Sequence, residues 1–123
     1  MNRRTHLIIG GVLFLAYVYV ASLLTGLFHH TSGELFFFGI LAAAAGSVFP
    51  DILEPPTSAK HRGFFHSRRM LKTVAVLFLI TASAVLFASG IPRFPLAFSA
   101  ACFSLGYAGH LAADSLTRAG LPG

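Results

Sequence analysis

The sequence predicts an all-α fold, an integral membrane bundle of four transmembrane helices that forms a single domain over residues 1–123. Composition is the first reason, because 55% of the residues are hydrophobic and only 11% are charged, whereas a typical soluble domain carries about 25% charged residues. The second reason is that the apolar residues form four segments without Asp, Glu, Lys or Arg, at 7–28, 35–49, 73–91 and 94–113. Short connections within each pair of segments favour antiparallel packing.

The first segment, 7–28, is long enough to cross a bilayer, since about 20 apolar residues suffice for a helix to span it. The preceding Asn2, Arg3 and Arg4 resemble the charged start of a secretory signal peptide. The apolar run is too long for a typical signal peptide, however, and no clear A-x-A cleavage site follows it. We therefore expect this segment to be a transmembrane helix.

The second segment, 35–49, is shorter, and a helix of this length spans only about 22 Å of a hydrocarbon core roughly 30 Å thick. Pro50 is expected to end the helix, because proline cannot donate a helical hydrogen bond. Either the bilayer thins here, or Asp51 lies below the headgroups in a recessed, partly dry pocket. The small residues Ala42 to Gly46 predict a face against which another helix packs closely.

The polar stretch 50–72 separates the two helix pairs and is predicted to be a loop. It is followed by the segments 73–91 and 94–113, the latter with Pro95 in a position that favours a helix start. Lys and Arg are distributed very unevenly, since Arg93 alone lies on one side and the other eight lie opposite: Arg3, Arg4, Lys60, Arg62, Arg68, Arg69, Lys72 and Arg118. The positive-inside rule then places both termini and the loop in the cytoplasm.

The chain is therefore expected to be a multi-pass membrane protein, with the lipid bilayer as its main partner. Its net charge of +5 is explained by cytoplasmic anchors and contacts with lipid headgroups, so nucleic acid is not expected as a partner. Four short helices bury little surface, which also makes a homo-oligomer compatible with the sequence.

The candidate functional residues gather where apolar segments begin or end on this same face. Four of the six histidines and two of the four acidic residues of the chain do so. Ionisable residues at such depths are rare and by default mark a functional site, and imidazole with carboxylate is a ligand set that suits zinc, with manganese or magnesium as alternatives. The predicted metal ligands are His6, Asp51, His61, His66, His110 and Asp114.

His110 and Asp114 form the strongest local pattern, because their i, i+4 spacing puts both side chains on one helix face. The alternative is a structural hydrogen bond in which Asp114 orients His110. For His61 and Arg62 the alternative is an ordinary solvated loop. His29, His30 and Glu34 lie at the other membrane face and are interpreted as an exposed turn.

Three blocks resemble the YdjM-like family: THLIIGG, PDILEPP followed by HRGFFHS, and GYAGHLAADSLTRAG. Members of this family are described as metal-dependent hydrolases of the inner membrane and are also labelled LexA-binding. The resemblance covers nearly the whole chain and implies a divalent metal site. The residues that match by position are His6, Asp51, His61, Arg62, His66, Ser67, His110 and Asp114.

The chain departs from the pattern PDxD that many relatives carry, because Leu53 stands at its last position. Either Glu54 substitutes for the missing carboxylate or a second metal is absent. A weaker likeness, in the HxxxD pair, is to zinc-dependent phospholipase C proteins.

The expected function is that of a membrane-bound metal-dependent hydrolase acting on phosphoester or lipid-linked substrates. Whichever of Glu54 and Asp51 is not a metal ligand is the candidate general base. Arg62 is expected to clamp an anionic substrate, and Ser67 is carried over from the resemblance as a catalytic candidate. One alternative is a non-catalytic membrane protein that binds metal or handles ions. Another is a scaffold that binds a cytoplasmic partner through its basic loop.

Overall fold

The computed structural model describes residues 2–25, 33–55, 63–87, 94–117 and 120–123. Its elements, in chain order, are α1 (Arg3–Thr25), α2 (Gly33–Leu53), the short 3-10 helix η2 (Phe64–His66), α3 (Arg68–Phe87) and α4 (Phe94–Ser115). All four α-helices are long and apolar enough to cross a membrane. The prediction of an all-α fold with four membrane-length helices is thus confirmed.

The expectation that Pro50 ends the second helix is wrong, because α2 continues through Pro50 to Leu53. A proline inside a helix removes one hydrogen bond and crowds the carbonyl four residues earlier, yet the packing around α2 tolerates this, with Pro50 fully buried. The helix has 21 residues and is about 32 Å long. A helix of this length needs no thinning of the bilayer. The predicted loop 50–72 is therefore too long, because part of it belongs to α2, η2 and α3.

Two further helices begin earlier than their apolar segments, and capping explains why. The side-chain oxygen of Asn2 accepts the backbone N–H of Thr5 at 3.0 Å, which starts α1 at Arg3 rather than at residue 7. The hydroxyl of Ser67 accepts the N–H of Met70 at 3.1 Å, so α3 starts at Arg68. Capping side chains of this kind satisfy backbone donors that have no partner within the helix.

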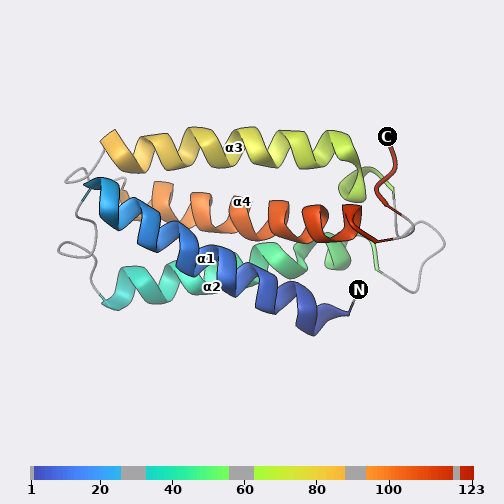
Figure 1. Ribbon diagram of the computed structural model, residues 1–123, viewed down its shortest axis with the longest axis horizontal. Coiled ribbons are helices and arrows are strands. Elements are labelled where there is room, and N and C mark those ends of the chain that lie inside the picture. The colour runs from blue at the N-terminus through green and yellow to red at the C-terminus, as the bar shows by residue number, and fades with distance from the viewer. Residues whose placement is uncertain (1, 26–32, 56–62, 88–93, 118–119) are drawn as a thin grey trace.

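Helix α4 lies at the centre of the bundle and packs against each of the other three (Figure 1). Of its membrane-spanning stretch, 56% is buried inside the protein, against 11% for α3. The N-terminus, the end of α2, the start of α3 and the end of α4 all lie at one end of the bundle (Figure 1). This arrangement brings residues far apart in the sequence together at that end.

Helices α2 and α4 approach so closely that their backbones touch at two glycines. A Cβ atom added to Gly46 would overlap the carbonyl of Phe103, and one added to Gly106 would overlap the carbonyl of Ala43. The small-residue face expected at Ala42 to Gly46 is therefore a helix contact, as is common within membranes. Close contact here sets the distance between the two helices that carry most of the candidate site.

The core consists of two apolar clusters along the bundle. One contains Phe14, Val18, Phe98 and Cys102, and the other contains Val74, Tyr107, Leu111 and Leu121 and lies on the α3 and α4 side. Large apolar side chains are also exposed on the outside of the helices, including Leu23, Leu24, Ile80, Phe87 and Leu96. Outward-facing apolar residues on membrane-length helices imply contact with the lipid bilayer.

Candidate metal centre

Five of the six predicted metal ligands come together at the end of the bundle where the four helices converge. Each comes from a different place in the sequence, and all are almost fully buried: His6 of α1, Asp51 of α2, His66 of η2, and His110 and Asp114 of α4. The sixth predicted ligand, His61, lies outside the described residues, as does Arg62. Burying two carboxylates among three imidazoles is costly unless the charges are compensated.

The tautomer of His110 is determined by a backbone carbonyl. Its Nδ1 lies 2.7 Å from the carbonyl oxygen of Ser47 on α2, and because a carbonyl can only accept, Nδ1 must carry the hydrogen. In the neutral ring the lone pair is then on Nε2, which points into the cluster. A histidine whose other nitrogen donates to a carbonyl in this way is the usual arrangement of a metal ligand.

His66 is oriented in the same manner by Glu54. The Nδ1 atom of His66 lies 2.8 Å from Oε2 of Glu54, and the same carboxylate accepts the backbone N–H of His66 at 3.1 Å and that of Phe65 at 3.2 Å. The hydroxyl of Tyr107 on α4 donates to the carbonyl of Phe65 at 3.1 Å. Glu54 and Tyr107 thereby fix η2 against the bundle and direct Nε2 of His66 inward.

The two inward nitrogens face each other and the carboxylate of Asp51. Nε2 of His66 is 3.2 Å from Nε2 of His110, and Oδ1 of Asp51 lies 3.4 Å from the first and 3.7 Å from the second. Oδ2 of Asp114 lies 3.4 Å from Nε2 of His110. Acceptor atoms at these distances repel one another unless a cation or a proton lies among them.

The spacing of these atoms fits a divalent metal. In a tetrahedral zinc site with bonds of about 2.0–2.1 Å, neighbouring ligand atoms lie about 3.3–3.4 Å apart, and the measured separations of 3.2, 3.4, 3.4 and 3.7 Å cluster around that value. Nitrogen and oxygen donors with fixed orientations are the chemistry that zinc selects. The donor atoms of His66, His110 and Asp114 all lie within 4.8 Å of one another, and Asp51 lies beside both imidazoles, so these residues could hold the metal that the sequence predicts.

His6 takes a different position from the other histidines. Its Nε2 is 3.4 Å from Oδ1 of Asp114, and its ring stacks on that of His110 with centroids 3.7 Å apart and planes at 22°. The Nδ1 atom of His6 is buried and has no hydrogen-bond partner within the described part of the chain. His6 therefore contacts the cluster through Asp114 and the face of His110.

No sequence pattern indicates the contact of His110 with the carbonyl of Ser47, because every residue has the same main-chain carbonyl. The contact of Glu54 with His66 is likewise not indicated by the sequence, because the two residues are 12 positions apart and do not share a helix. Tyr107 lies in the GYAGH block but was not singled out. Its position one helical turn before His110 indicates that it lies on the same face of the helix as this histidine.

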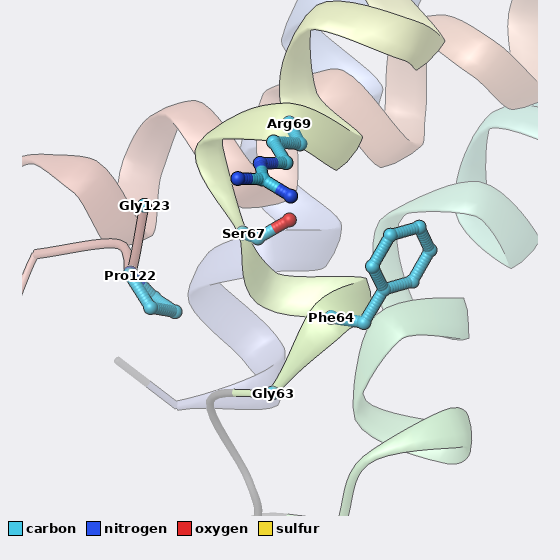
Figure 2. Close-up of a pocket in the computed structure, with 6 residues that line it drawn as sticks. All are labelled: Gly63, Phe64, Ser67, Arg69, Pro122 and Gly123. Carbon is cyan, nitrogen blue, oxygen red and sulfur yellow. The ribbon is translucent and has the colours of Figure 1, made fainter.

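An open hollow of about 370 Å³ lies at the same end of the molecule, beside the start of α3. Figure 2 shows Ser67 and Arg69 on one wall and Phe64 nearby, with the C-terminal Pro122 and Gly123 on the other side. The carbonyl of Pro122 accepts the backbone N–H of Arg68 at 2.9 Å, which fixes the C-terminal residues against α3. The hollow combines a cation, a hydroxyl and an apolar ring.

The sequence model of a family described as YdjM inner membrane protein matches residues 1–122. No curated protein and no solved structure matches the chain. The match covers nearly the entire sequence, including every residue of the buried cluster, and it agrees with four membrane-length helices. The chain therefore belongs to the YdjM inner membrane protein family and is an inner-membrane protein.

Proposed function

We propose that this protein is a membrane-bound metal-dependent hydrolase with one zinc site at the end of the bundle. The observation that carries the proposal is the facing pair of buried imidazoles, His66 and His110, whose Nε2 atoms are 3.2 Å apart with the carboxylate of Asp51 beside them. Hydrogen bonds at both Nδ1 atoms leave lone pairs where a metal would bind.

Bound zinc supplies an activated water at neutral pH and polarises the bond to be cleaved. The chain itself contributes the ligands and their support. Asp51, His66, His110 and Asp114 would hold the metal, and Glu54 keeps the imidazole of His66 in the ligating tautomer. Because both oxygens of Glu54 already accept hydrogen bonds, we assign it an orienting role in preference to that of general base.

The substrate we propose is an anionic phosphoester of the membrane surface. The site lies at an end of membrane-length helices, where a lipid-linked headgroup can approach without leaving the bilayer. Ser67 and Arg69 line the hollow beside this end and offer a hydroxyl and a guanidinium as donors to phosphate oxygens. The excess of Lys and Arg at this end supports a cytoplasmic orientation.

A proton shared between His66 and His110 is the competing occupant of the cluster, which corresponds to a protein that relays protons and not to a hydrolase. The Ser and Thr hydroxyls within the helices argue against proton relay and for the hydrolase. Those of Ser22, Thr81, Ser83 and Ser104 donate to carbonyls of their own helices. They therefore do not form a polar path that an ion could follow through the bundle.

The test is elemental analysis of the purified protein together with a screen of phosphoester and lipid-phosphate substrates. We expect close to one zinc per chain, with metal and hydrolysis both lost in His110→Ala and Asp114→Ala. Ser104→Ala is the matched control, because Ser104 is equally buried on α4 but donates to Ala100. A metal-free wild type that stays metal-free after reloading with zinc, manganese or magnesium would refute the proposal.

A further inference from the structure

We infer that His6 is not a metal ligand but the positioning residue of Asp114, so that among the histidines of the described residues only His66 and His110 ligate the metal. This inference rests on the proposed metal site and goes beyond it. The sequence pattern and the position of His6 next to the cluster both favour a third histidine ligand. The orientation of the rings argues against it.

Two imidazoles on one metal must diverge from it. With a metal–nitrogen bond of about 2.0–2.1 Å, each ring centroid lies about 3.2 Å from the metal, so two tetrahedral ligands have centroids about 5.2 Å apart. The rings of His66 and His110 have centroids 5.3 Å apart with planes at 64°. This pair therefore has the separation that two ligands of a tetrahedral metal require.

The rings of His6 and His110 do not meet this requirement. Their centroids are 3.7 Å apart and their planes are nearly parallel, at 22°. Two ligating rings this close would subtend an angle of only about 70° at a metal, well below the tetrahedral value. His6 has a nitrogen within 4.8 Å of the donor atoms of Asp51 and His110, but stacking alone brings it that near.

The contact with Asp114 indicates that His6 positions this carboxylate. The two oxygens of this carboxylate are divided, with Oδ1 at 3.4 Å from Nε2 of His6 and Oδ2 at 3.4 Å from Nε2 of His110. A ligating carboxylate commonly has its second oxygen held by a neighbouring donor. His6 supplies that donor through Nε2, and its stacked ring also prevents His110 from turning. Both contacts are made from α1, which provides no other residue of the cluster.

X-ray absorption spectroscopy of the zinc-loaded protein tests this inference, because multiple scattering from imidazole counts the histidine ligands. We expect two imidazoles per zinc in the wild type from His66 and His110, and the same count in His6→Gln as in the wild type whether or not His61, outside the described residues, adds a third. In His6→Gln, where the amide nitrogen can replace Nε2 as a donor to Asp114, the count and the zinc affinity should be retained. In His6→Ala the count should still be two, with zinc affinity reduced about 10- to 100-fold.

His66→Gln provides the comparison, since loss of a true ligand should lower the imidazole count to one or abolish binding. The inference is overturned if the wild type shows three imidazoles and His6→Gln shows two. A thermal melt of each metal-free variant in detergent separates loss of a ligand from loss of the fold. A count of two in a protein without hydrolytic activity would support the inference while refuting the hydrolase, whereas a wild type that binds no metal would overturn both.

Discussion

Replacing Glu54 distinguishes an orienting carboxylate from a general base. Its Oε2 accepts from both Nδ1 and the backbone N–H of His66, and its Oε1 accepts from the N–H of Phe65. In Glu54→Gln the amide oxygen can keep both bonds to His66 only if the amide nitrogen faces the N–H of Phe65. One backbone donor is then left without its acceptor, which costs about 1–3 kcal/mol.

We therefore expect Glu54→Gln to lower the free energy of unfolding by about 1–3 kcal/mol and to weaken zinc binding about tenfold. Glu54→Ala removes all three acceptor contacts and the group that keeps the hydrogen on Nδ1 of His66. Zinc affinity should then fall about 100-fold, the upper end of the range for groups that support a metal ligand. The expected order of affinity is wild type, Glu54→Gln, Glu54→Ala.

The assay is competition titration of zinc against a chromophoric chelator, with thermal denaturation of each metal-free variant in the same detergent. Glu34→Gln is the matched control, because Glu34 is exposed in the first turn of α2, at the other end of that helix. The reasoning is refuted if both Glu54 variants bind zinc and unfold like the wild type but lose turnover. That result would make Glu54 the general base.

Three further predictions concern the support of the site. Gly106→Val should destabilise the bundle by about 3 kcal/mol or more and lower the amount of folded protein recovered from membranes, because its side chain would overlap the backbone of α2. Ser67→Ala should cost about 1 kcal/mol in thermal denaturation through loss of the α3 cap and leave zinc affinity unchanged. A large loss of turnover at full zinc occupancy would instead give Ser67 a catalytic role. Tyr107→Phe should lower the free energy of unfolding by about 0.5–1.5 kcal/mol, since its hydroxyl donates to the carbonyl of Phe65, and an unchanged melting temperature would contradict this.

Hydropathy alone located the four helices, because the bilayer demands long apolar helices whatever their packing. It misplaced their ends. Helix α1 begins at Arg3 and α3 at Arg68, since a helix continues into the polar interface once a cap such as Asn2 or Ser67 starts it. Those caps were readable in the sequence. The passage of α2 through Pro50 was not, because it depends on tertiary packing that outweighs the local preference of proline.

The candidate site could be predicted as a set of residues but not as a geometry. Helix ends on one membrane face must lie near one another, which was enough to group His6, Asp51, His66, His110 and Asp114. Which nitrogen of each ring turns inward depends on partners such as the carbonyl of Ser47 and the carboxylate of Glu54, and these contacts join distant segments. The sequence therefore predicts His6 as a metal ligand like the other histidines, whereas in the structure its ring stacks on that of His110.

If the proposed site binds metal, the convergence of α1, α2, η2 and α4 on one cluster would link metal supply to the amount of protein that persists in the membrane. A metal that binds the assembled bundle and not the separated helices adds stability by mass action, about 2.7 kcal/mol when free metal is at 100 times its dissociation constant. A bundle deprived of metal keeps two carboxylates and three imidazoles buried close together where these helices meet, without the cation that would attract both. Chelation should then loosen the end that carries the site first, so a cell short of metal would lose the protein to proteolysis as well as the hydrolysis proposed for it.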